Sequence, residues 1–233
     1  MSWIDQFVGR CHLTLPDEVR ESLWGRGASD EQIDLFRVGY INGELPSDIE
    51  YPNAFLEWSL DGSKLSDFYV FPLTDWLGDV KGVQFRPVPR DKKGYTDFFI
   101  DKTQAVLFGL GPAASSVWGT GKVCLVEGVF DLFPVQRVVP HVIATLTAKV
   151  SDALVRSLLR IAKQVHLLYD NDATGERGRD KFIRFYGSLF DTRVVEYPRG
   201  VVMSNGSRVK DPGDLWEAWG DDRVGPYLRS QLE

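Results

Sequence analysis

Cysteine, histidine and methionine are scarce in this chain of 233 residues, which contains two, three and two of them. Cys11 and Cys124 lie far apart, and His12 directly follows Cys11, so four zinc ligands cannot be assembled at the usual spacing. Cys124 lies in an apolar run, where a thiol behaves as a small hydrophobic group. The histidines have no carboxylate spaced for a catalytic triad. The sequence therefore predicts no structural zinc module.

Long apolar runs are also missing. No stretch approaches the roughly 18 uninterrupted apolar residues of a membrane span. The first ten residues, MSWIDQFVGR, carry an acid early and no apolar segment, which argues against a secretory signal. We therefore expect a cytoplasmic protein without a membrane partner, or one in the host cytoplasm if its source is viral.

An excess of basic residues, which nucleic-acid-binding proteins usually carry, is absent as well. The chain has 27 Lys and Arg residues against 33 Asp and Glu residues, a formal net charge of −6. Affinity for a polyanion would therefore depend on a local basic patch and would be weakened by salt. Bound cations would offset part of the acidic charge.

The chain does contain three acidic clusters in its second half, each beyond a predicted strand. They are Glu127 and Asp131 after residues 123–126, Asp170 and Asp172 after residues 165–169, and Asp211 and Asp214 beyond residues 194–197. In an open parallel sheet, ligands bind outside the carboxyl ends of the strands. Carboxylates that converge there need a cation to offset their repulsion. The spacing therefore predicts a divalent-metal site at this edge of a small sheet.

Hydrophobic patterns predict an α/β fold, with a parallel sheet flanked by helices after a mixed α+β N-terminal part. The predicted parallel strands are 123–126, 139–144, 165–169 and 192–197, with helices at 132–137, 151–163, 174–186, from about 214, and 224–232. Nearer the N-terminus, Ser29 and Gln32 form a capping box that opens a short helix. Residues 68–73 and 80–86 are predicted to pair as a hairpin with its turn at 77–79.

The three acidic motifs together resemble the Toprim domain and, more closely, the catalytic core of bacterial and phage DnaG-type DNA primases. The segments that carry the resemblance are LVEGVFD (125–131), LLYDNDATGERGRDK (167–181) and VKDPGDLW (209–216). Looser similarities extend it over roughly residues 20–215. Two features depart from the family pattern: TDFF at 96–99 replaces an asparagine-bearing stretch, and Gly213 separates Pro212 from the following acid.

The resemblance implies three parts: an N-terminal α+β subdomain (1–117), a Toprim catalytic domain (118–200) and a C-terminal loop and helical segment that completes the metal site (201–233). It implies synthesis of short RNA primers on single-stranded DNA from nucleoside triphosphates, by two-metal nucleotidyl transfer. The expected cofactors are two or more Mg²⁺ or Mn²⁺ ions and no zinc. A replicative helicase or a separate zinc-binding protein is a possible partner, and so small a core would suit a phage.

By the same resemblance, Glu127 is the candidate general base, and Asp170 and Asp172 complete the catalytic set. The candidate metal ligands are Glu127, Asp131, Asp170, Asp172, Asp211 and Asp214. The candidate nucleotide- and template-binding residues are Arg26, Arg86, Lys92, Lys93 and Lys210. Carboxylate oxygens suit Mg²⁺, and the guanidinium groups of Arg26 and Arg86 suit bidentate contacts with phosphate.

Two alternatives remain open at the level of the sequence. A Toprim nuclease would cleave phosphodiesters with the same metal ions, although the N-terminal segment resembles a primase. A non-catalytic module would recruit other replication proteins, although all the expected acids are present. A topoisomerase is disfavoured because it needs a further strand-passage domain. A primase needs nucleoside triphosphates, a nuclease needs only metal, and a recruiter needs neither.

Overall fold

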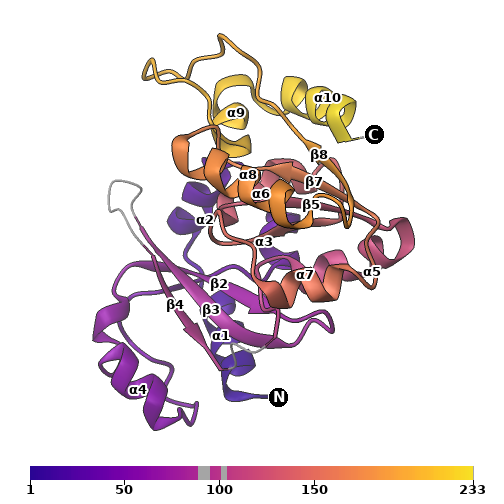
Figure 1. Ribbon diagram of the computed structural model, residues 1–233. Coiled ribbons are helices and arrows are strands. Elements are labelled where there is room, and N and C mark those ends of the chain that lie inside the picture. Colours follow the sequence, from indigo (N-terminus) through magenta and orange to yellow (C-terminus); the bar gives the residue numbers. More distant parts are fainter. Residues whose placement is uncertain (89–94, 101–103, 233) are drawn as a thin grey trace.

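The computed structural model of the protein describes residues 1–88, 95–100 and 104–232, and contains two four-stranded sheets with helices around them (Figure 1). The N-terminal half comprises α1 (Trp3–Leu13), α2 (Asp17–Trp24), α3 (Asp30–Leu35), β1 (Gly39–Ile41), α4 (Asn53–Ser59), the 3₁₀ turn η1 (Ser63–Leu65), β2 (Phe68–Thr74), β3 (Val80–Pro87) and β4 (Thr96–Phe99). The C-terminal half comprises α5 (Leu110–Thr120), β5 (Lys122–Val126), α6 (Val129–Gln136), β6 (Val142–Ala144), α7 (Asp152–Leu158), β7 (Gln164–Leu168), α8 (Ala173–Tyr186), β8 (Asp191–Val194), α9 (Pro212–Trp219) and α10 (Asp221–Leu232).

The first sheet is antiparallel, in the order β1-β2-β3-β4, and both of its faces are covered. Successive side chains of a strand point to opposite faces. Tyr69 and Phe71 of β2 therefore enter the large core shared with the second sheet, whereas Val70 enters a smaller core with Phe7 of α1 and Phe85 of β3. The predicted hairpin of residues 68–86 is confirmed.

The second sheet is parallel, in the order β6-β5-β7-β8, as the alternation of strands and helices predicted. Its central strands β5 and β7 are buried except at Lys122 and apolar except at Lys122, Gln164 and His166, and Cys124 is fully buried there as a free thiol. Two predicted strands are shorter than expected, because only 142–144 and 191–194 pair in the sheet. Helix α6 begins at Val129 and so takes in Asp131, earlier than the predicted start at 132.

The register of the parallel sheet determines where the acidic motifs lie. Val126 of β5 is paired with Leu168 of β7, so that Glu127 and Asp170 leave the same edge of the sheet from neighbouring strands. Helix α9, which follows the third motif, packs against α6. The three motifs are thereby brought to one place. Among the described residues, no helix is long and apolar enough to cross a membrane.

Candidate active site

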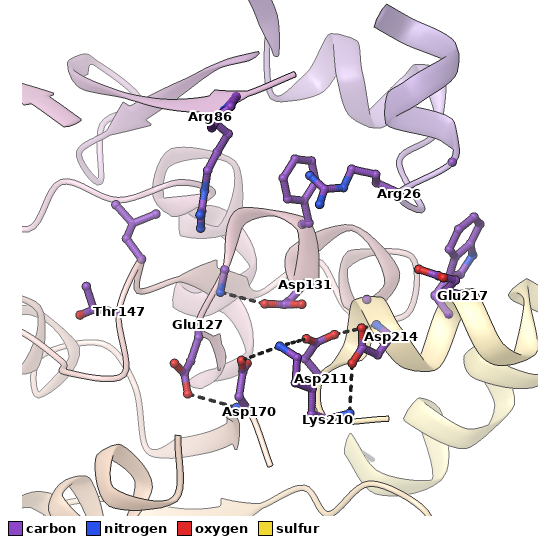
Figure 2. Close-up of a pocket in the computed structure, with 17 residues that line it drawn as sticks. Arg26, Arg86, Glu127, Asp131, Thr147, Asp170, Lys210, Asp211, Asp214 and Glu217 are labelled. Carbon is purple, nitrogen blue, oxygen red and sulfur yellow. Dashed lines mark hydrogen bonds and ion pairs between the residues drawn. The ribbon is translucent and has the colours of Figure 1, made fainter. Parts of the chain in front are cut away.

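A cavity of about 440 Å³ opens at the carboxyl edge of the parallel sheet, below the N-terminal half (Figure 2). Its charged lining residues are Arg26, Arg86, Glu127, Asp131, Asp170, Lys210, Asp211, Asp214 and Glu217. Five of the six predicted metal ligands are therefore brought together from three separate segments. Figure 2 shows the carboxylates on one side of the cavity and the two arginines on the other.

Glu127 and Asp170 form the part of the acidic group contributed by the two central strands. The backbone N–H of Asp170 donates to Oε1 of Glu127 at 3.1 Å. Burial, and then the charge of Asp170, raise the pKa of Glu127 to about 7. Burial, and then the charge of Asp211, raise the pKa of Asp170 to about 6. The pKa values of both groups therefore lie closer to neutral than that of a free carboxyl group, which is the range that suits a general base.

Asp131, Asp211 and Asp214 form the buried part of the group, and each is at most 8% exposed. Asp131 accepts a hydrogen bond from the N–H of Gly128 at 2.9 Å, and Asp211 accepts one from the N–H of Asp214 at 2.6 Å. Both therefore cap the helices that carry them. Burial, and then the charge of Asp211, raise the pKa of Asp131 well above its usual value. A Cβ at position 213 would lie 3.2 Å from Oδ1 of Asp131 and 3.3 Å from Oδ1 of Asp211, so a larger residue there would press on both carboxylates.

Lys210 occupies the space between two of these carboxylates. Its Nζ lies 3.4 Å from Oδ2 of Asp170 and 3.0 Å from Oδ2 of Asp211 (Figure 2). Burial opposes its charge, but Asp211 and Asp170 raise the pKa of Lys210 above its usual value. The ammonium group therefore neutralises the acidic group from within. Lys210, predicted from the sequence to bind nucleotide or template, contacts carboxylates in this arrangement.

The donor set fits a hard divalent cation, because every candidate ligand is a carboxylate oxygen. Oδ1 of Asp170 is buried without a hydrogen-bond partner, which is costly for a carboxylate unless a cation or water contacts it. Within residues 1–88, 95–100 and 104–232, however, no three His, Cys, Asp or Glu side chains are already arranged around an ion position. A cation at Asp170 and Asp211 would compete with the ammonium group of Lys210, which contacts both carboxylates.

Asp172, the sixth predicted ligand, does not line the cavity. Its carboxylate is exposed and accepts hydrogen bonds from the N–H groups of Thr174 and Gly175, at 2.8 and 2.9 Å. The hydrogen bond from Gly175 is the main reason that the pKa of Asp172 is lowered. In this arrangement Asp172 is the N-cap of α8.

Arg26 and Arg86, two of the residues expected to bind nucleotide or template, form the basic side of the cavity. Arg86 lies on β3, where its Nε donates to Oε1 of Gln84 at 3.1 Å and its guanidinium faces the ring of Tyr95 at 4.8 Å. Burial lowers the pKa of Arg86, and the charge of Asp131 opposes that shift. Lys92 and Lys93 lie outside the described residues, so their predicted role stays a prediction.

Phe130 was not singled out from the sequence, yet it orients Arg26. The Cζ atom of Arg26 lies 3.7 Å from the centre of the Phe130 ring, a cation–π contact. Tyr69 and Phe71 hold this ring edge-on, at centroid distances of 5.9 and 5.3 Å. The sequence did offer a signal for Phe130, because this aromatic residue lies inside the EG-x-x-D turn and directly precedes Asp131. Trp216 packs against Gly27 and also lines the cavity.

We expect the stabilisation of the protein by Mg²⁺ to increase as the pH rises from about 5 to about 8. The folded-state pKa values of Glu127 and Asp170 exceed their unfolded values, so these groups stabilise the metal-free fold at low pH and lose that contribution as the pH rises through about 6 and 7. Cations compete with the same protons. His166, whose pKa burial lowers to about 4, acts oppositely and loses its contribution as the pH falls.

The measurement is the melting temperature with Mg²⁺ minus that with a chelator, at each pH. Taking this difference removes the metal-independent contribution of His166. An Asp170→Asn variant should show a smaller difference at every pH. A difference that is constant across the pH range would contradict the proposed coupling between metal binding and these carboxylates.

Comparisons with known proteins agree with this architecture. The family model described as Toprim-like matches residues 124–208, which include the first two acidic motifs. A DNA primase from Deinococcus radiodurans is 27% identical over 244 residues, covering 94% of this chain but only 41% of that relative. A solved DnaG catalytic core superimposes with a TM-score of 0.75 at 18% identity, covering 99% of this chain and 79% of the other. A DnaG primase catalytic domain bound to single-stranded DNA superimposes with a TM-score of 0.71 at 19% identity, covering 99% and 78%.

Proposed function

We propose that this chain, which matches the catalytic core of DnaG-type primases in sequence and fold, synthesises short RNA primers on single-stranded DNA. The observation that carries the proposal is the convergence of five carboxylates, from three segments, opposite Arg26 and Arg86 in one cavity. Nucleotidyl transfer requires both a cation site and groups that neutralise a triphosphate. The chain spans less than half the length of the curated relative from D. radiodurans, so its activity and partners are inferences about this part alone.

Glu127 is the residue that we assign to accept the proton of the primer 3′-hydroxyl. Its pKa of about 7 lets it hold a proton and release it again near neutral pH. Arg26 and Arg86 face it across the cavity and would contact the phosphates of the incoming nucleotide and the template. Their charge would offset the negative charge that builds up on the triphosphate during transfer.

Asp170, Asp211 and Asp214, with Asp131 behind them, are the residues that would hold Mg²⁺ or Mn²⁺. When bound, such ions activate the attacking hydroxyl and stabilise the leaving pyrophosphate. Lys210 would leave its position between Asp170 and Asp211 and become available to a phosphate. Asp172 lies beside this group and would enter it only if α8 gave up its N-cap. We further propose two or more ions, and the cytoplasm as the compartment, because template and nucleotides are available there.

The decisive experiment uses purified protein, unprimed single-stranded DNA and labelled nucleoside triphosphates, with Mg²⁺ or Mn²⁺ and with a chelator. Metal-dependent appearance of short labelled products is the expected result. Degradation of the DNA without nucleotides would instead support a nuclease. If neither occurs, the result points to a missing partner or to a recruiting role, and addition of a helicase or a separate zinc-binding protein distinguishes the two.

We expect Phe130→Leu to weaken the use of nucleotide or template without abolishing synthesis. The change removes the ring beneath Arg26, a contact worth about 0.5–2 kcal/mol. Its loss corresponds to a roughly two- to thirtyfold rise in KM, with little change in kcat. Phe130→Tyr keeps an aromatic face and should retain most of the wild-type KM. The measurement is steady-state kinetics of Phe130→Leu, Arg26→Gln and the double variant. Because one contact is lost in all three, the effects should not add, and additive effects would argue against the positioning role of Phe130.

A further inference from the structure

A second cavity, of about 350 Å³, lies between the two halves of the molecule and away from the acidic group. Its walls are the turn between β2 and β3, with Asp75, Trp76 and Leu77, and helix α7 with Arg156 and Arg160 just beyond its end. Figure 1 shows α7 beside the sheet of the N-terminal half. The first cavity lies toward the other end of β3. Arg86, which lines that cavity, is about 20 Å along the strand from Val80 at the usual rise per residue.

The charge in this cavity is positive. Arg156 lies in the last turn of α7 and Arg160 lies just beyond the end of that helix, and both line the cavity. Within the part of the chain that the structure describes, neither guanidinium makes a hydrogen bond or an ion pair. Asp75, the carboxylate among the described lining residues, is already compensated. Its Oδ1 accepts hydrogen bonds from the N–H groups of Leu77 and Asp79, at 2.9 and 3.1 Å, and its Oδ2 lies 3.8 Å from Nζ of Lys81.

The remaining wall is apolar. Trp76 offers an aromatic surface, and Leu77 is 82% exposed at the rim. A volume of this size matches the lower end of small-ligand pockets, about 300–1,000 Å³, which are frequent at domain interfaces. Two unpaired guanidiniums favour a phosphate group, and an aromatic wall favours a flat base.

We propose that this second cavity binds a free nucleotide, with its phosphates on Arg156 and Arg160 and its base against Trp76. A volume of about 350 Å³ is sufficient for one nucleotide. A nucleotide held there would touch both halves of the molecule and so would favour one relative arrangement of the halves. The site would thereby couple nucleotide concentration to the geometry of the first cavity, where Arg86 of one half faces Glu127 of the other.

The test is calorimetric titration of the full chain with ATP in the presence of a chelator, which suppresses metal-dependent binding in the first cavity. Arg156→Gln combined with Arg160→Gln is compared with a control pair, Arg184→Gln combined with Arg223→Gln, which removes the same charge from α8 and α10. All four side chains are on the surface, so both variants should fold. Loss of two charge-assisted contacts should weaken ATP binding at least about tenfold in the first variant only.

Equal weakening in both variants would reveal unspecific attraction to positive charge and overturn the proposal. Unchanged binding in the first variant would overturn it as well. If a single-stranded oligonucleotide binds in a manner that depends on Arg156 and Arg160 while ATP does not bind, the cavity is part of a strand path and not a nucleotide site. Photoreactive ATP analogues provide an independent readout, since cross-links should map to Trp76 or to α7. None of these measurements depends on primer synthesis, so the proposed function is tested separately.

Discussion

Glu127→Gln is expected to lower metal-dependent nucleotide incorporation by about 10²–10⁴-fold, the range for loss of a general acid or base. The amide has nearly the same shape and can still accept the hydrogen bond from the N–H of Asp170. It cannot take a proton, and it no longer contributes charge to a cation. Asp170→Asn should have an effect of similar size because Asp170 lies in the same cavity, with one oxygen buried and unpaired.

The matched control is Asp180→Asn, which makes the same change in charge on an exposed part of α8, where the carboxylate lies 3.4 Å from Nε of Arg179. It should leave incorporation close to wild type. Asp172→Asn is informative as well. Asn caps helices about as well as Asp, so stability should be kept, and any large loss of activity would place Asp172 among the metal ligands. Full activity of Glu127→Gln, measured by product formation on unprimed single-stranded DNA, would exclude the assigned role of Glu127.

Gly175→Ala is expected to both destabilise the protein and abolish its activity. A Cβ at this position would lie 2.1 Å from the carbonyl oxygen of Asp170 and 2.6 Å from Oε1 of Glu127. Backbone atoms cannot yield to such a contact without a shift of the whole turn. Insertion of atoms into a well-packed site typically costs about 1–3 kcal/mol of unfolding free energy. The shift would also separate Glu127 from Asp170, whose relative position the chemistry requires.

The control for this change is Gly119→Ala in helix α5. A Cβ there would meet no atom within 4 Å. The substitution should raise the unfolding free energy by roughly 0.4–1 kcal/mol, because alanine restricts the unfolded chain and favours helix. Urea denaturation measures both variants. If Gly175→Ala proved as stable and active as wild type, the close approach of α8 to the acidic group would be wrong.

The sequence alone was sufficient for the local and periodic features. The apolar runs predicted both central strands of the parallel sheet. Strands that are buried on both faces appear in the sequence as apolar runs, so they can be identified without knowing which strands they pair with. The capping box of Ser29 and Gln32 forms as predicted, with both of its hydrogen bonds, because it is made within four residues. The strand-end position of Glu127 and Asp170 also follows from sequence, since parallel strands share an edge.

Helices α1, α4 and α5 were not predicted. Helix α5 is rich in small residues and contains three of the weak helix formers, Gly111, Pro112 and Gly119, so its stability comes from burial of one face. Strand β4 is only four residues long, and its pairing with β3 makes it a strand. Such elements depend on partners far away in the sequence, which local propensity does not report.

Within the site, the sequence determined which acids are available, whereas tertiary structure decided which of them meet. The spacing of Asp170 and Asp172 alone allowed both to flank one ion, but the start of α8 turns Asp172 outward as a cap. The contact of Lys210 with Asp170 spans 40 residues, and that of Arg26 with Phe130 joins the two halves of the molecule. Side-chain type and position along a strand are properties of the sequence, but the direction of a carboxylate is set by the hydrogen bonds and packing around it, which exist only once the chain is folded.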